Sequence, residues 1–474
     1  MFRSKALLVL LAGLAVLGAA PAFAQPERAR EAERRQQAQI LESAGGAYDG
    51  PQGAYVARVG ERVAAAAGLP GRCTFTVVNS ETVNAFTAPP GCYIYVTRGL
   101  LAIMNSEAEL AGVLGHELGH VTANHAGKQR NAEVGAGLAA MIVGAVAKSD
   151  QAGRLAGQVA KLGTLSYSRN QEYEADSLGL RYLAASGYAT QGLTRVLEGL
   201  QREDQYSARG AAAPTDAVPV WARTHPLTTD RIRRVAQQAG RQVTFGDPVT
   251  GVQPYLTAMD GLTYGPDLDQ GVIVGQSFIH PSLRVAFEAP EGFRLINGQR
   301  AVRIEGAGGL RAEFSMATLD AGLEDRASRT LRDIVGQAQV QWGQPTSTRI
   351  NGLDAVILPS RARSQGNPVD LVAVAYGAGG GRAYQFVSMA PAGRGRVFDT
   401  LYGSLRRLSE REAASLSGQK IELLTVRGGD TVEKLALRMS VREKLPLFLM
   451  LNALDPVQPL EPGRKVKVIT GGPR

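Results

Sequence analysis

The pentapeptide His-Glu-Leu-Gly-His at residues 116–120 constrains this chain more than any other feature of its sequence. It lies in a strongly predicted helix, because Ser106 with a glutamate three residues later is a helix-start pattern followed by apolar residues at helical spacing. The alternative is an ordinary helix with two surface histidines. Residues four apart on a helix differ by only about 40° of rotation, so His116 and His120 project from one face. This arrangement predicts that both imidazoles bind one metal ion, with Glu117 beside them to take a proton from a bound water.

A catalytic zinc site needs a third protein ligand and one open position. The best candidate is Glu172, which lies in the acidic run 170–176 at the start of a second predicted helix. Glu172 and Asp176 are four residues apart and share a face of that helix, whereas Glu174 points elsewhere. The alternative is a solvated acidic helix start, where carboxylates favour the helix dipole. We expect Glu172 to bind the metal and Asp176 to accept an N–H from a ligating imidazole, which fixes its tautomer.

Together, the pentapeptide, the EYEAD run at 172–176 and Thr-His-Pro at 224–226 resemble the zinc metallopeptidase family that contains the CAAX prenyl protease, HtpX and BepA. The resemblance covers roughly residues 45–239, including Asn-Ala-Phe at 84–86 and the strand-like run 93–96. It implies a mainly helical gluzincin-type peptidase domain with a small sheet beside the cleft. We find no counterpart of the membrane helices of HtpX or of the helical repeats of BepA, so no single relative indicates the substrate.

The resemblance assigns a role to each residue of the motifs. It implies one Zn²⁺ per chain, bound by His116, His120 and Glu172. It makes Glu117 the catalytic general base and places Asp176 behind the ligands.

The other three histidines have different expected roles. His225 follows a low-complexity loop at 208–219 and corresponds to a family histidine near the metal, which either blocks the open position or supports the transition state. His125 lies five residues after His120, about 140° round the helix, so it should not reach the same metal. His280 lies at the start of a predicted strand, and we expect it to be structural.

The N-terminus has the pattern of a cleavable export signal. Arg3 and Lys5 precede an almost continuously apolar stretch at 6–20, and Ala-Phe-Ala at 22–24 supplies a small-x-small cleavage site. The alternative is a retained anchor, but the apolar stretch is short for a membrane span. The longest later apolar segment, 134–147, is also too short, and we expect it to be a buried or interfacial helix. We therefore predict a signal peptide at 1–24, a periplasmic location and no transmembrane helix in the mature chain.

Only two cysteines occur, Cys73 and Cys92, and each begins a strand-like run. In an oxidising compartment such a pair is a disulfide candidate, and two buried free thiols are the alternative. A zinc site made from them is not expected, because they do not form a Cys-x-x-Cys pair.

At 474 residues the chain is too long for one hydrophobic core. The expected fold is multidomain α+β: a zinc metallopeptidase domain at 25–245, a linker at 246–275, an α+β domain of unknown role at 276–412 and a LysM-like module at 418–470. The α+β domain is predicted from alternating strands and two helical patterns. Its glycine run at 377–381 predicts a hairpin tip rather than a phosphate loop, because no helix follows.

The last segment resembles a LysM module over about 50 residues. The resemblance rests on Gly-Asp-Thr at 429–431, Leu-Asn at 451–452 and Pro-Gly at 462–463 before a strand at 466–468. It implies a βααβ unit that binds N-acetylglucosamine polymers. Residues 442–446 depart from the family's polar loop, which puts sugar binding in doubt.

These resemblances imply an exported zinc-dependent endopeptidase that cleaves unfolded or misassembled cell-envelope proteins. An extended substrate would add to the sheet edge near residues 84–87, where backbone hydrogen bonds supply affinity. The alternative is a latent or inactive peptidase acting as a chaperone-like or cell-wall-binding envelope factor, and a third hypothesis is a peptidoglycan hydrolase. Protein or peptide substrates are the expected partners. Peptidoglycan and the outer-membrane assembly machinery are further candidates, and we expect no nucleic acid partner.

Overall fold

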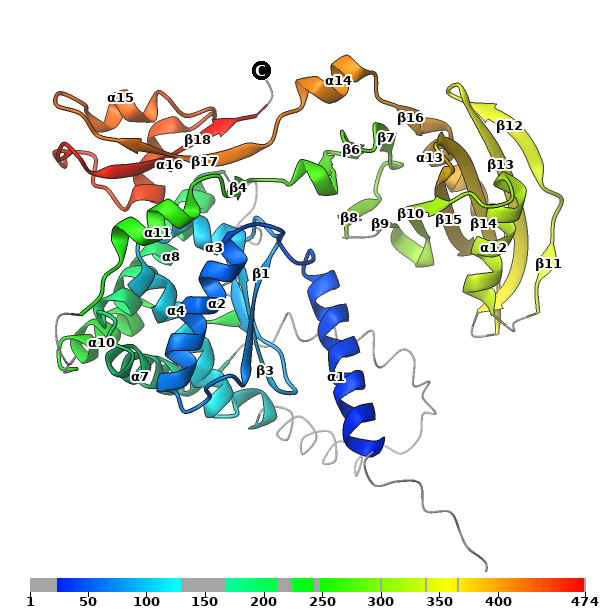
Figure 1. Ribbon diagram of the computed structural model, residues 1–474. Coiled ribbons are helices and arrows are strands. Elements are labelled where there is room, and N and C mark those ends of the chain that lie inside the picture. Colours follow the sequence, from blue (N-terminus) through cyan, green and yellow to red (C-terminus); the bar gives the residue numbers. More distant parts are fainter. Residues whose placement is uncertain are drawn as a thin grey trace, which may run out of the picture.

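The structure, a computed structural model, describes most of the chain as one helical region and one sheet-rich region (Figure 1). The predicted signal peptide before Ala24, the predicted helix at 134–147 and most of the loop at 208–219 lie outside the described residues. No helix within the described part is long and apolar enough to span a membrane. The described residues are 24–128, 167–210, 221, 224–242, 248–298, 301–336, 339–364 and 366–472.

The helical region is built around one central helix, α4, which runs from Glu107 to Thr122. Ser106 caps its start by accepting the backbone N–H of Glu109 at 3.2 Å, as the sequence predicts. Helices α2, α7 and α8 pack around it. The helices of this region are α1 (Ala24–Ser43), α2 (Gln52–Ala66), α3 (Arg98–Ile103), α4, α7 (Arg169–Ala185), α8 (Gln191–Gly210), α10 (Thr229–Ala239) and α11 (Val252–Met259).

Glycines on α4 let its neighbours approach closely. A Cβ atom added at Gly119 would lie 2.8 Å from the carbonyl oxygen of Ala175 in α7, and one at Gly112 would lie 2.9 Å from the Cα of Leu193 in α8. Both distances are shorter than a real carbon contact allows, so only glycine fits there. The close approach of α4 and α7 brings the two motif-bearing helices side by side.

A small sheet covers another side of α4. Its strands are β1 (Cys73–Val78), β2 (Ala85–Thr87) and β3 (Cys92–Thr97), in the order β1-β3-β2. β1 and β3 are parallel and each begins at its cysteine, as the sequence predicts, while β2 is antiparallel to β3 at the edge. Cys73 and Cys92 face each other in this register and form a disulfide, which decides between the two alternatives left by the sequence.

The stretch at 246–275, expected as a linker, contains helix α11. Tyr255, Leu256 and Met259 of α11 are buried in the core of the helical region. Their spacing of one and four residues is the helical signal. The surrounding glycine, proline and aspartate residues hid this signal in the sequence.

The sheet-rich region follows as a large antiparallel sheet with α12 (Leu323–Val335) on one face. Strand β14 turns into β15 through the glycine run 377–381, so the predicted hairpin tip is confirmed. His280 lies in a smaller sheet, where its Nδ1 accepts the backbone N–H of Leu283 at 3.2 Å. The large sheet contains β8 (Arg294–Asn297), β9 (Ala301–Glu305), β10 (Arg311–Thr318), β11 (Gln341–Trp342), β12 (Thr346–Ile350), β13 (Leu353–Ser364), β14 (Asn367–Gly379) and β15 (Arg382–Pro391); the smaller contains β5 (Val272–Val274), β6 (Ser277–His280), β7 (Val285–Glu288) and β16 (Arg406–Arg407).

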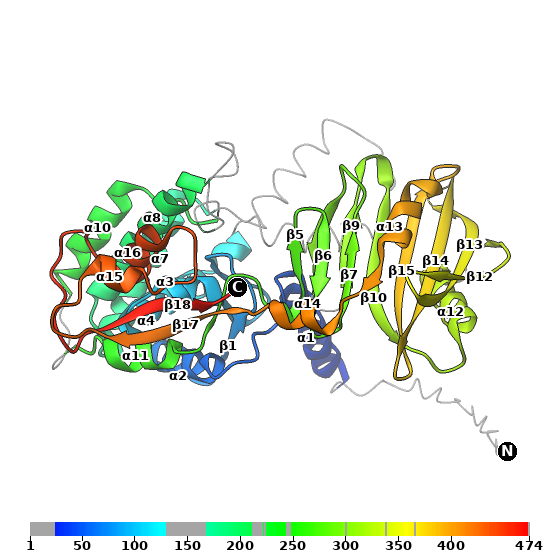
Figure 2. The same ribbon diagram turned by 90° about the horizontal axis from the view of Figure 1, so that it is seen from above.

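The last segment returns to the helical region, as Figure 2 shows from above. It has the order β17 (Gln419–Thr425), α15 (Val432–Ala436), α16 (Lys444–Asn452) and β18 (Lys465–Gly471), with the two strands antiparallel. We call residues 419–471 the C-terminal module. Its βααβ order matches the expectation, while its identity as a LysM module stays a prediction. Its apolar residues belong to the same hydrophobic core as those of α4 and α11, so the module is packed onto the helical region.

One buried lysine joins the C-terminal module to the start of α4. Lys467 is 0% exposed, and its Nζ donates to the carbonyl oxygens of Ala102 at 2.6 Å and Met104 at 2.7 Å, just before the cap of α4. Burial lowers the pKa of Lys467 to about 7, against the opposing effect of the nearby carboxylate of Glu109. The module therefore holds the chain that leads into the central helix.

Replacing Lys467 by Met should lower the free energy of unfolding by about 2–4 kcal/mol, because each buried carbonyl left without a donor costs about 1–3 kcal/mol. The matched control is Lys465→Met on the same strand, whose Nζ makes only an exposed contact with Thr257 at 3.4 Å. That variant should stay within about 0.5 kcal/mol of the unmodified chain. Denaturant unfolding followed by circular dichroism measures both. Equal losses in the two variants would mean that Lys467 does not support the start of α4.

Candidate metal centre

Four side chains from three segments converge between α4 and α7. Ligand atoms of His116, His120, Glu172 and His225 all lie within 4.8 Å of one another. Each of these residues is at most 2% exposed. The structure thus brings together the three residues predicted to bind the metal and the histidine predicted to lie near it.

His116 is oriented by a carboxylate behind it. Its Nδ1 lies 2.9 Å from Oδ1 of Asp176. Burial alone would raise the pKa of Asp176, but Arg231 outweighs burial and holds that pKa at about 2, so this carboxyl is ionised and can only accept. In the neutral imidazole of His116 the proton is therefore on Nδ1, and Nε2 carries a free lone pair. This Nε2 lies 3.0 Å from Nε2 of His120.

Glu172 presents a charged carboxylate to the same point. Its Oε1 lies 3.4 Å from His120 Nε2, and its Oε2 lies 3.6 Å from His116 Nε2. Burial opposes ionisation, but His225 and Arg231 hold the pKa of Glu172 well below its usual value. Burial also lowers the pKa of His120, which keeps that imidazole neutral. An anionic oxygen beside imidazole nitrogens is the ligand chemistry of a divalent transition metal.

Glu117 is fully buried, and neither of its carboxylate oxygens has a hydrogen-bond partner among the described residues. Burial raises its pKa, against the opposing effect of His225, whose Nε2 lies 3.6 Å from Oε1 of Glu117. A buried carboxylate without a donor is costly. Both the free oxygens and the raised pKa suit a group that exchanges a proton with water or substrate, so the residues present fit a hydrolytic metal centre.

The imidazole of His225 packs against an aromatic side chain. The Trp221 ring stacks on its imidazole, with centroids 4.3 Å apart, and the backbone N–H of His225 donates to Trp221 at 2.7 Å. Its Nδ1 lies 3.0 Å from Oε1 of Glu172. Burial opposes protonation, but Glu172 and Glu117 raise the pKa of His225 above its usual value. His225 can therefore face the two carboxylates as a cation or, once neutral, offer a nitrogen to a metal.

Arg231 is a central residue that the sequence analysis missed. It is 1% exposed, and its Nε donates to Oδ2 of Asp176 at 2.8 Å while its Nη1 lies 2.5 Å from Oε2 of Glu172. It pairs with the two carboxylates that flank the imidazoles. The signal was present in the sequence, because Arg231, Val235 and Ala239 are spaced by four and share the buried face of α10.

His125 also has a contact that the sequence analysis did not anticipate. It lies outside the ligand group, as expected, but its Nδ1 is 2.9 Å from Nδ1 of His120 and its Nε2 is 3.1 Å from Oε2 of Glu174. The rotation argument assumed a helix that continues to His125. In fact α4 ends at Thr122, and Asn124 has a φ of 50°, which turns the chain back.

One segment of the chain, which contains these residues, is similar to known proteins. Residues 51–239 match the family described as Peptidase family M48. The beta-barrel assembly-enhancing protease of Escherichia coli K12 is 30% identical over 178 residues, which cover 35% of this chain and 34% of that protein. The metalloprotease YcaL of the same organism is 36% identical over 135 residues, covering 27% of this chain and 52% of YcaL. The matched segments thus span only about a third to a half of the length of these relatives.

Among solved structures, that of cyanobacterial PsbP from Synechocystis sp. PCC 6803 covers 29% of this chain and 98% of its own. The sequence identity is 14% and the TM-score is 0.24.

Replacing Arg231 by Met should lower the free energy of unfolding of the metal-free protein by about 3–5 kcal/mol, because buried charges lose their partner. Arg233→Met on the same helix is the matched control, since Arg233 pairs with Asp230 at the surface at 3.0 Å. The control should change the free energy by less than about 0.5 kcal/mol. Urea unfolding in the presence of a chelator measures both. A small effect at Arg231 would show that Asp176 and Glu172 do not need its charge.

Proposed function

We propose that this chain, whose residues 51–239 form a peptidase family M48 domain, is a zinc-dependent endopeptidase acting on unfolded or misassembled proteins of the cell envelope. The observation that carries the proposal is the buried convergence of two imidazoles and an ionised carboxylate beside Glu117, whose carboxylate has no hydrogen-bond partner among the described residues. In this proposal His116, His120 and Glu172 bind Zn²⁺. Asp176 orients His116.

Glu117 moves the proton in the proposed reaction. When bound, Zn²⁺ polarises the scissile carbonyl and lowers the pKa of a water towards about 7. Glu117 takes the proton of the attacking water on a carboxylate oxygen and passes it to the leaving amine nitrogen. Arg231 keeps the carboxylates of Asp176 and Glu172 in place.

The edge strand β2 supports a preference for extended substrates. Among the described strands β2 pairs only with β3, and β2 packs against α4. A substrate strand added to this edge would gain backbone hydrogen bonds whatever its sequence. Such a mode requires an exposed, unpaired backbone, which unfolded proteins offer and folded proteins do not. This supports unfolded or misassembled proteins as the substrate class.

An envelope role is supported from two directions. The N-terminal sequence predicts export to the periplasm, and one relative is named a beta-barrel assembly-enhancing protease. The outer-membrane assembly machinery is therefore a candidate partner of this chain. Peptidoglycan is a second candidate, through the LysM-like sequence of the C-terminal module.

The second candidate function is a latent peptidase that acts as a chaperone-like or cell-wall-binding factor. One observation favours it: His225 belongs to the buried group of candidate ligands. An imidazole in the fourth position of the zinc would exclude the water that the reaction consumes. The two functions share one site and differ in whether His225 leaves it.

Replacing Glu117 by Gln tests the proposed function directly. The purified chain should hold about one zinc ion per molecule. The Gln variant should keep that zinc, because Glu117 is not a ligand, and lose at least about 10²–10⁴-fold in hydrolysis of unfolded casein, because it cannot accept the proton. Metal analysis and a peptide-release assay measure the two effects. A chain that takes up no zinc, or a variant with unchanged turnover, would refute the proposal.

Replacing His225 by Ala separates its two roles. We expect weaker zinc binding and faster basal hydrolysis per bound zinc, because the fourth position opens to water. His280→Ala in the sheet-rich region is the control and should change neither quantity. A loss of about 10²-fold in kcat at full zinc occupancy would instead assign His225 to the oxyanion.

A further inference from the structure

We infer that His125 and Glu174 form a positioning chain, His120–His125–Glu174, that holds the metal ligand His120 with its Nε2 free to bind. The inference deepens the proposed function and rests on it, because it assigns two residues to the support of one zinc ligand. Its members contact neither substrate nor metal. They act through His120.

The two histidines of the pentapeptide differ in the group that contacts their Nδ1 atoms. His116 has the buried carboxylate of Asp176 on its Nδ1 at 2.9 Å. The Nδ1 of His120 has instead the Nδ1 of His125, also at 2.9 Å. A histidine that binds a metal through Nε2 almost always donates its Nδ1–H to a second residue, and that residue fixes both tautomer and ring orientation. His125 holds this place for His120.

Glu174, the last member of the positioning chain, determines which nitrogen of each imidazole carries the proton. Oε2 of Glu174 lies 3.1 Å from Nε2 of His125. The Glu174 side chain is 52% exposed, and an exposed glutamate is ionised at neutral pH, so this carboxylate only accepts. The proton of His125 is therefore on Nε2, and its Nδ1 is an acceptor.

His120 must then supply the proton between the two imidazoles. With Nδ1 of His125 as acceptor, the contact of 2.9 Å is a hydrogen bond only if His120 donates from Nδ1. The neutral ring of His120 consequently has a bare Nε2, and this atom lies 3.0 Å from Nε2 of His116. Two free lone pairs at that distance repel each other without a cation. The opposite tautomers would put a proton on Nε2 of His120 and block metal binding.

The local fold explains how His125 reaches this place. After α4 ends at Thr122, the left-handed conformation of Asn124 turns the chain, and His125 becomes completely buried. The Tyr167 ring stacks on His120, with centroids 3.9 Å apart, and prevents the ring from tilting away.

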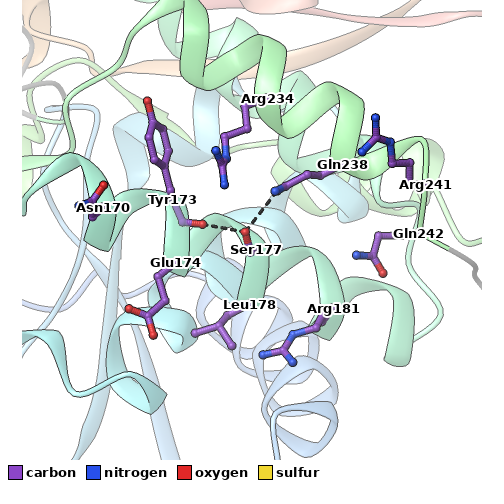
Figure 3. Close-up of a pocket in the computed structure, with 10 residues that line it drawn as sticks. All are labelled: Asn170, Tyr173, Glu174, Ser177, Leu178, Arg181, Arg234, Gln238, Arg241 and Gln242. Carbon is purple, nitrogen blue, oxygen red and sulfur yellow. Dashed lines mark hydrogen bonds between the residues drawn. The ribbon is translucent and has the colours of Figure 1, made fainter.

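Glu174 approaches from the outer side of α7. It follows Glu172 by two residues, about 200° round the helix, so it cannot enter the metal site. Its side chain is 52% exposed, and Figure 3 shows it among the residues that line a surface pocket formed by α7 and α10. The positioning chain therefore runs from the buried ligand to the protein surface, so Glu174 can be changed without disturbing the core.

The first test measures zinc affinity by competition with a chromophoric chelator. His125→Phe keeps a ring but removes the acceptor, and should raise the dissociation constant about 10–100-fold. His125→Asn places an amide oxygen near the lost Nδ1, so it should recover part of that affinity. The matched control is His280→Phe, which makes the same chemical change in the sheet-rich region and should leave the constant unaltered.

The second test changes Glu174, whose side chain is exposed and can be replaced without affecting folding. Glu174→Leu should weaken zinc binding, whereas Glu174→Gln should keep most of the affinity because its amide oxygen still accepts from His125. Glu198→Leu, at an exposed glutamate of α8, is the control and should have no effect. Imidazole ¹⁵N spectra of the zinc-free protein should show His125 protonated on Nε2, and a mixture of tautomers in Glu174→Leu.

The outcomes separate this inference from the proposed function. If the unmodified chain binds no zinc, the proposed function fails, while the tautomer of His125 can still be read from the zinc-free spectra. If the unmodified chain binds zinc and both His125→Phe and Glu174→Leu keep its affinity, the positioning chain is wrong and the proposed function stands. A spectrum with His125 protonated on Nδ1 would also overturn the inference.

Discussion

Between α4 and α7 three carboxylates lie out of contact with bulk water, and the rest of the site follows from how their charge is met. Burying a carboxylate costs several kcal/mol unless a partner compensates it. Arg231 brings one positive charge to Asp176 and Glu172, both of which stay ionised. His225, whose pKa is raised by Glu172 and Glu117, supplies a second positive charge when it is protonated, and the raised pKa of Glu117 limits the remaining negative charge. In the proposed function, a metal ion between Glu172 and the imidazoles would take over the role of the charge on His225.

Such precise placement requires that α4 be fixed along its length. Glycines at its contacts with α7 and α8 bring the helices closer than any side chain would permit. At its start, Lys467 of the C-terminal module binds the carbonyl groups that precede it. Just beyond its end, the turn at Asn124 carries His125 back against His120. The C-terminal module, which is packed onto the core of the helical region, and the turn thus make contacts at opposite ends of α4.

The parts predicted correctly from the sequence depend on local signals. The cap at Ser106 defines the start of α4, and a spacing of four residues brings His116 to His120 and Glu172 to Asp176. The four-residue spacing that buries Arg231 was obscured by the charge of this residue. The periodic signal of the helix in the expected linker was obscured by the surrounding glycine residues. His125 could not have been placed, since its position depends on a left-handed residue after the helix and on Glu174 from another segment. Periodicity predicts which side chains share a face of a helix, but it does not predict the path of the chain after the helix ends.

The balance of charge also connects the metal with His225. In the described geometry Nδ1 of His225 lies 3.0 Å from Glu172, and its neighbouring carboxylates raise its pKa. A protonated His225 supplies one positive charge to the same carboxylate that a metal would neutralise. A metal bound by Glu172 would compete with the charge on His225, because it would remove the electrostatic cause that protonates His225. In the proposed function, the neutral imidazole would be either a fourth ligand or a hydrogen-bond donor, and these two states would correspond to latency and to catalysis.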